Sequence, residues 1–162
     1  MGMKDNIMKK TQKKIKTKIK TTLDLAKKIA DIADEKKAID IQVLELKKLT
    51  SFTDYFIICS GTSDRHVQAI AAHLEASCKQ AGMLPLGVEG VREGRWVLLD
   101  CADVVIHVFH EPVREFYDLE RLWTDAQRIP VEIDGATDSA MPRDKTKTAK
   151  KTKTLSQRQA SA

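Results

Sequence analysis

The chain has 162 residues, of which 42% are hydrophobic, and a formal net charge of +5. This length predicts one domain, and no apolar run approaches the roughly 18 residues of a membrane span. Three cysteines without paired spacing argue against a disulfide framework, and the N-terminus lacks the apolar segment of a secretory signal. We therefore expect a cytoplasmic protein that makes no membrane contact.

The charge is unevenly distributed along the chain. Residues 1–20 hold eight Lys and one Asp, and residues 134–162 hold seven Lys or Arg and three Asp, whereas residues 21–133 hold 13 basic and 19 acidic residues. We predict an acidic domain over 20–133 between two disordered basic tails, 1–19 and 134–162. Such tails attract RNA phosphates without reading sequence, and an acidic body favours a basic protein surface.

The first predicted elements are one helix and two strands. A stripe of Leu and Ile residues at helical spacing predicts a helix over about 22–36. Alternating apolar and polar residues over 39–43 indicate a half-buried strand that ends near Leu46. The continuous apolar run 55–59 indicates a central strand covered on both faces.

The turn at residues 60–63 leads into the most regular helix of the sequence. Thr62 or Ser63 can cap its start, apolar residues recur at helical spacing from Val67, and Gly82 is the type of residue expected just after its end. The turn follows a buried strand, as a catalytic serine turn does, but it lacks the Gly-x-Ser-x-Gly pattern. We interpret its hydroxyl groups as helix caps.

Three strands and a last helix complete the predicted fold. A short strand lies near 86–88, residues 96–101 and 104–109 form an antiparallel hairpin, and one helix runs from Pro112 through Trp123. The order is α-β-β-α-β-β-β-α. It predicts an α/β (α+β) fold, in which a mixed sheet carries helices on its faces.

The histidines do not form a metal-binding pattern. His107 and His110 lie three residues apart on a strand, so their side chains point to opposite faces. His66 and His73 lie two helical turns apart, and the chain has no Cys-x-x-Cys motif. We predict neither a metal nor a cofactor.

The main enzymatic alternative is nucleotidyl transfer, because a Gly-Ser-like turn after a central strand is the topology of polymerase-beta-like nucleotidyltransferases. Their two-metal chemistry needs paired carboxylates on the next strand. The matching segment here reads Gly87-Val88-Glu89, so one carboxylate of the pair is missing. Asp100 can stand for a third carboxylate, but it does not complete the pair. We predict that the scaffold is shared and that the activity is absent.

Residues 37–129 resemble the RsfS/Iojap family of ribosomal silencing factors. Four blocks in the same order carry the resemblance, and they are residues 53–67 (TDYFIICSGTSDRHV), 85–100 (with PLGVEG and WVLLD), 103–109 (DVVIHVF) and 114–123 (REFYDLERLW). The tails lie outside these blocks.

This resemblance implies a function without catalysis. Members of the family bind ribosomal protein L-fourteen on the large ribosomal subunit and sterically block association with the small subunit, which represses translation when nutrients are scarce. Organellar relatives act in large-subunit biogenesis. The resemblance also implies a nucleotidyltransferase-like fold and a homodimer when the protein is free.

Aromatic residues near carboxylates suggest where a basic ribosomal protein docks. We expect the core to contain Phe56 and Phe116. The predicted partner-binding residues come from the hairpin and the last helix, together with two acids before the hairpin, and they are Trp96, Leu98, Asp100, His107, Phe109, Tyr117, Glu120, Trp123, Glu89 and Glu93.

Overall fold

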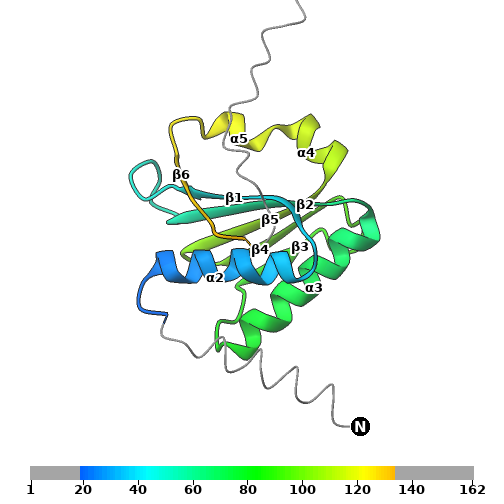
Figure 1. The fold of residues 1–162 in the computed structure, drawn as a ribbon, viewed down its shortest axis with the longest axis horizontal. Coiled ribbons are helices and arrows are strands. Elements are labelled where there is room, and N and C mark those ends of the chain that lie inside the picture. Colours follow the sequence, from blue (N-terminus) through cyan, green and yellow to red (C-terminus); the bar gives the residue numbers. More distant parts are fainter. Residues whose placement is uncertain (1–18, 134–162) are drawn as a thin grey trace, which may run out of the picture.

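The computed structural model describes residues 19–133 (Figure 1). Both predicted tails therefore lie outside the described residues, except for Ile19. The elements in chain order are α2 (Thr22–Glu35), β1 (Ile39–Glu45), β2 (Tyr55–Gly61), α3 (Asp64–Gln80), β3 (Gly87–Glu89), β4 (Trp96–Cys101), β5 (Val104–His110), α4 (Glu111–Tyr117), α5 (Leu119–Leu122) and β6 (Gln127–Ile129). None of the helices within 19–133 is long and apolar enough to cross a membrane.

The six strands form one mixed sheet in the order β3-β4-β5-β2-β1-β6. Only β2 and β5 run parallel, with Ile57 opposite Ile106, and the other neighbours are antiparallel. The predicted hairpin is β4–β5, whose turn residue Ala102 has a φ of 63°. The predicted α/β class and element order are confirmed, and β6 is an addition that we did not predict.

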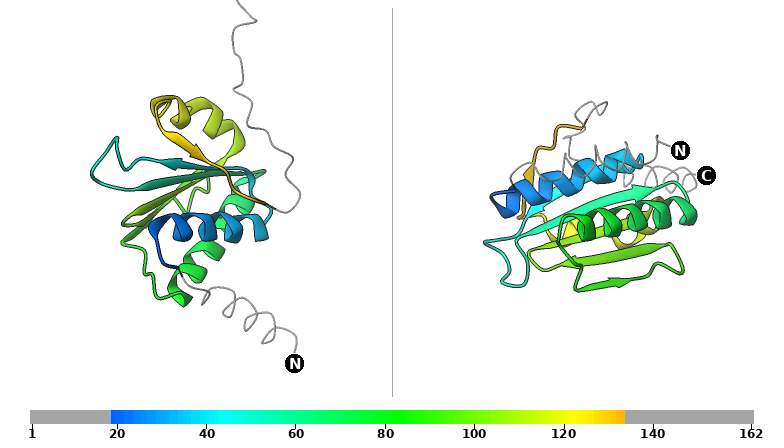
Figure 2. Two further views of the ribbon diagram at one scale, coloured as in Figure 1. Left: turned by 60° about the vertical axis from the view of Figure 1, so that its left-hand side comes forward. Right: turned by 90° about the horizontal axis from the view of Figure 1, so that it is seen from below.

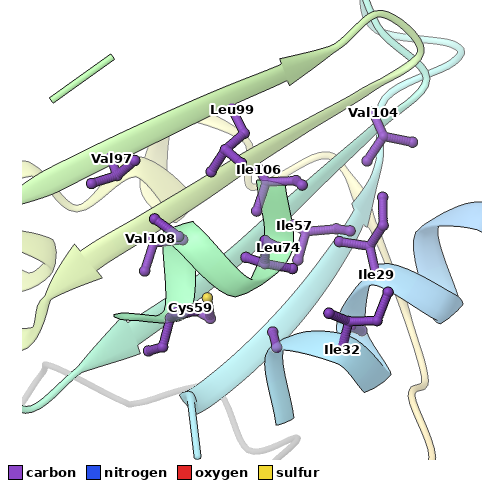
Figure 3. Close-up of a cluster of buried hydrophobic side chains, with 14 of the residues drawn as sticks. Ile29, Ile32, Ile57, Cys59, Leu74, Val97, Leu99, Val104, Ile106 and Val108 are labelled. Carbon is purple, nitrogen blue, oxygen red and sulfur yellow. The ribbon is translucent and has the colours of Figure 1, made fainter. Parts of the chain in front are cut away.

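Helices α2 and α3 cover one face of the sheet and enclose the larger core (Figures 1 and 2). Ile29 of α2 and Leu74 of α3 meet Ile57 of β2 and Ile106 of β5 there, and none of the four side chains is exposed (Figure 3). Every residue of β2 is buried. The prediction of a central strand covered on both faces is confirmed.

Local capping defines the ends of the two long helices. Thr21 and Asp24 form a reciprocal capping box at the start of α2. Ser63 caps α3 by accepting a hydrogen bond from the backbone N–H of His66 at 3.1 Å. Gly82 follows α3 with a φ of 78°, a conformation that glycine adopts without strain. The predicted cap and C-terminal glycine are therefore confirmed.

The opposite face carries a smaller core beneath α4 and α5 (Figure 1). The prediction of one helix from Pro112 through Trp123 was wrong. Asp118 adopts a left-handed conformation, with φ 47° and ψ 52°, and separates α4 from α5. This break turns the chain so that β6 can pair with β1, where Val43 lies opposite Ile129.

Candidate docking surface

Strand β4 presents alternate side chains to the face that α4 partly covers. Trp96, Leu98 and Asp100 lie opposite Phe109, His107 and Val105 of β5, respectively. Side chains at alternate positions of a strand share a face, so the strand alternation predicted this arrangement correctly. The intervening residues of β4 point into the larger core.

Trp96 is half-buried and is held by contacts on several sides. Its ring stacks on Phe109 with a centroid separation of 4.8 Å and an interplanar angle of 27°, and it lies 5.0 Å from the ring of Tyr117. Its indole N–H donates a hydrogen bond of 3.1 Å to Nδ1 of His107. These contacts fix the orientation of Trp96 before any partner arrives, which reduces the entropy lost on binding.

His107, the hydrogen-bond acceptor for Trp96, is buried in the fold. Only 4% of the side chain is exposed, and burial lowers its pKa to about 4, so the ring is neutral at pH 7. Because Nδ1 accepts the hydrogen bond from Trp96, the ring proton lies on Nε2. Phe109 is fully buried. The predicted partner contacts for these two residues are therefore corrected, since neither side chain reaches the surface.

Two neighbouring aromatic residues of α4 remain in solvent. Phe116 is 81% exposed and Tyr117 is 53% exposed, and their rings meet edge to face at 5.1 Å. The expectation that Phe116 belongs to the core was wrong. Helix α4 turns Arg114 toward the sheet and leaves Phe116 outside.

Two hollows open on either side of Trp96. The larger has a volume of about 510 Å³ and lies between β4 and α4, and the smaller has a volume of about 260 Å³. We call their combined lining the Trp96 surface. It consists of Glu89, Gly90, Glu93, Arg95, Trp96, Leu98, Pro112, Val113, Phe116 and Tyr117. Aromatic side chains and two carboxylates therefore share one concave surface.

Comparison of the sequence with known proteins identifies its family. A family model described as "Ribosomal silencing factor during starvation" matches residues 19–160. The chain belongs to the RsfS family. It is 47% identical to the ribosomal silencing factor RsfS of Bacillus subtilis over 100 residues, which cover 61% of this chain and 85% of that protein. It is also 36% identical to chloroplastic Iojap of Arabidopsis thaliana, over 75% of this chain and 50% of that protein.

Solved structures of similar sequence share the fold. A Bacillus halodurans protein is 38% identical with a TM-score of 0.57, over 64% of this chain and 94% of that one. A Chromobacterium violaceum protein is 37% identical with a TM-score of 0.58, over 67% of this chain and 92% of that one. As a member of the RsfS family, this chain is a ribosomal silencing factor that regulates translation and is not an enzyme.

Other predicted site residues of this RsfS-family chain lie away from the Trp96 surface. Asp100 lies near the far end of β4 and accepts a hydrogen bond of 2.9 Å from the backbone N–H of Ala102. Trp123 is half-buried and packs on Phe56 and Phe52, with centroid separations of 5.6 and 6.4 Å. Neither Asp100 nor Trp123 lines either hollow.

Glu120 belongs to an ion pair within the domain, and its predicted role as a docking charge stays a prediction. Its Oε1 accepts from Nε of Arg114 at 2.7 Å and lies 2.6 Å from Nη2 of the same residue. Nη1 of Arg114 donates to the carbonyl oxygen of Asp40 and to Oγ of Ser60, both at 2.9 Å. This network joins α4 and α5 to the central strands of the sheet.

The histidines have structural partners instead of a shared metal ion. His110 lies 3.0 Å from Asp64, and His73 lies 2.9 Å from Glu35. His66 accepts from the backbone N–H of Thr62 at 3.0 Å and contacts the carbonyl oxygen of Lys36 at 2.8 Å. Within residues 19–133 no three His, Cys, Asp or Glu side chains are grouped to hold a metal.

Some residues of the Trp96 surface were not identified from the sequence. Arg95, Pro112 and Val113 line the larger hollow, but their residue types carry no pattern that marks them as surface contacts. Gly90 lines both hollows. Its φ of 83° is a backbone conformation that glycine adopts without strain and other residues rarely adopt.

Gly90→Ala is expected to lower the free energy of unfolding by about 1–3 kcal/mol. An added Cβ would lie 2.0 Å from the carbonyl oxygen of Trp96, and the backbone at Gly90 has a positive φ. Gly87→Ala is the matched control, because nothing lies within 4 Å of its Cβ position. Urea denaturation of both variants tests this, and equal stabilities would show that the turn accommodates a side chain.

Proposed function

We propose that this chain docks through the Trp96 surface onto ribosomal protein L-fourteen of the large ribosomal subunit. Bound there, it blocks association with the small subunit and represses translation under nutrient limitation. The observation that carries this proposal is the oriented, half-buried Trp96 between two hollows. Rigid aromatic side chains beside pockets are the usual energetic centres of protein interfaces.

Charge supports a basic protein as the partner. Residues 21–133 carry six more acidic than basic residues, and Glu89 and Glu93 lie on the rim of the Trp96 surface. Complementary charge at a rim increases the rate of association more than the final affinity. A mouse relative, 33% identical over 59% of this chain, is named "Mitochondrial assembly of ribosomal large subunit protein 1", which supports the choice of subunit.

The same proposal covers the free protein and the tails. The exposed Phe116 and Tyr117 provide an apolar contact for a second copy, so we propose a homodimer off the ribosome. The basic residues of 1–20 and 134–162 would add salt-sensitive contacts to ribosomal RNA without subunit preference. The bacterial relatives support a cytoplasmic location.

Co-sedimentation with purified subunits tests the docking. The full chain should pellet with large subunits and not with small ones at physiological salt, and an immobilised L-fourteen protein should retain it. Equal binding to both subunits would contradict the proposal, because it would leave only RNA affinity from the tails. Repeating the measurement at several salt concentrations separates these two contributions.

Phe116→Ala is expected to weaken large-subunit binding by about tenfold or more. The side chain is 81% exposed, so the loss should occur without a change in the melting temperature. Phe52→Ala is the matched control, because Phe52 is 62% exposed and lies in the β1–β2 loop, at the end of the sheet away from α4 (Figure 1). If only Phe52→Ala weakened binding, the docking surface would lie around Phe52 and Trp123 instead.

A further inference from the structure

A second group of apolar side chains lies in solvent at the end of the sheet away from α4 (Figures 1 and 2). Leu49 and Phe52 of the β1–β2 loop are exposed, and so is Leu122 at the end of α5. Trp123, which follows Leu122, is half-buried and meets the ring of Phe52 edge to face at 6.4 Å. Apolar side chains that gather on a surface mark interaction sites, whereas single exposed ones do not.

The β1–β2 loop that carries Phe52 is held in place from within the domain. The backbone N–H of Leu46 donates to the carbonyl oxygen of Asp54 at 2.8 Å, and its carbonyl oxygen accepts from the N–H of Leu49 at 2.9 Å. The ring of Phe52 lies 6.2 Å from that of Phe56, which belongs to the smaller core. A partner would therefore meet an exposed ring whose position is already fixed, which reduces the entropy lost on binding.

This apolar group is separate from the Trp96 surface. Phe109, the partner of Trp96 in the sheet, lies opposite Ser60 of β2, whereas the Phe52 loop leads into Tyr55 at the start of β2. These two positions are about five residues of strand apart, or roughly 17 Å. Neither hollow beside Trp96 is lined by any residue of the loop or of α5.

The side chains around this group are mostly basic. Within residues 46–54 and 119–128, the exposed charged residues are one acid, Asp125, and four bases. Residues 21–133 as a whole carry six more acidic than basic residues, so this end of the domain is a local exception. We call it the Phe52 surface, and it consists of Leu49, Phe52, Leu122 and Trp123 with the basic rim Lys47, Lys48, Arg121 and Arg128.

We propose that the Phe52 surface binds an acidic segment of another protein. Aliphatic or aromatic side chains of that segment pack on Phe52 and Leu122, and its carboxylates face the basic rim. The exposed leucines favour a protein over RNA, because unstacked bases pack on aromatic rings or guanidinium planes and gain little from aliphatic side chains. The proposal does not rest on docking through the Trp96 surface, which stays free when the Phe52 surface is occupied.

The test is selection of a random peptide library, displayed on phage, against the immobilised full-length chain. Each selected peptide is then measured against the wild type and against Phe52→Ala, whose melting temperature is compared first. Peptides captured by the Lys-rich tails bind both proteins alike and are set aside. The remaining peptides should be rich in Asp and Glu, should contain Leu, Ile or Phe, and should bind Phe52→Ala about tenfold more weakly or worse.

Charge reversal provides the second measurement. The double variant Lys47→Glu, Lys48→Glu should weaken the binding of the same peptides by about fivefold or more. Its matched control is Lys27→Glu, Lys28→Glu, an equal change of charge on α2, which covers the opposite face of the sheet. This control should bind the peptides as the wild type does.

Two single variants separate this inference from the proposed function. Phe116→Ala should bind the acidic peptides normally and lose affinity for the large subunit, whereas Phe52→Ala should show the reverse pattern. The inference is overturned if no selected peptide depends on Phe52, or if those that do carry no excess of acidic residues. It is also overturned if Phe52→Ala changes the sedimentation of the free chain, which would indicate a second copy, or lowers its affinity for single-stranded RNA.

Discussion

Arg114→Met is expected to lower the free energy of unfolding by about 3 kcal/mol, because it leaves the partly buried carboxylate of Glu120 without its cationic partner. Arg114 is only 7% exposed and binds Glu120, whose side chain is 16% exposed. Its loss also removes the donor to Ser60 and to the carbonyl oxygen of Asp40. Methionine keeps much of the side-chain volume, so the loss reports mainly on charge and hydrogen bonding.

Arg121→Met is the matched control for this measurement. Arg121 lies on the exposed side of α5, so this variant should unfold within about 0.5 kcal/mol of the wild type. The double variant Arg114→Met, Glu120→Gln should recover part of the stability, because the unpaired charge of Glu120 is removed as well. Urea denaturation of the three variants checks this, and equal stabilities for Arg114→Met and Arg121→Met would contradict it.

Acidification should destabilise the domain through His107. Its pKa is about 4 in the folded protein and about 6.5 in an unfolded chain, so the unfolded state binds the extra proton between these values. The contribution of this residue to stability is complete above about pH 6.5 and falls as the pH drops toward 4, by about 3 kcal/mol in all. Below pH 4 both states are protonated and the loss stops growing.

His107→Gln isolates this contribution from that of the carboxylates. Glutamine has no titration in this range and retains an oxygen that can accept the hydrogen bond from Trp96. The free energy of unfolding, measured between pH 4.5 and 7, should therefore fall less steeply for the variant than for the wild type. Parallel curves for the two proteins would show that the ring of His107 is protonated equally in the folded and unfolded states.

Features fixed by neighbouring residues were predicted from the sequence. Ser63 and Gly82 cap α3 because a short hydroxyl side chain and a residue free to adopt positive φ are needed there, whatever the rest of the chain does. The alternation of β4 likewise placed Trp96 and Leu98 on one face. These are local rules, and they hold before any tertiary contact forms.

Features that depend on distant partners were missed. The helical spacing of apolar residues after Pro112 continues through Asp118, and it therefore predicted an unbroken helix. In the fold Asp118 adopts a left-handed conformation, and Glu120 beyond it forms an ion pair with Arg114. Strand β6 has only three residues, which are too few for a detectable alternation of apolar and polar side chains. It is a strand because it pairs with β1, which lies far away in the sequence. Whether His107 and Phe109 of β5 are buried, and whether Phe116 of α4 is exposed, also depends on which face of α4 packs on the sheet.

The edges of the sheet limit how any partner can bind. The outer strands β3 and β6 have three residues each, and β1 has an irregular register between Ile39 and Gln42, where Asp40 has a φ of 48°. Short and irregular edges offer few unpaired backbone groups in a row, which protects a sheet from adding strands and from aggregating. Recognition by backbone pairing is therefore disfavoured, and a partner has to be recognised by the side chains on the face of the sheet.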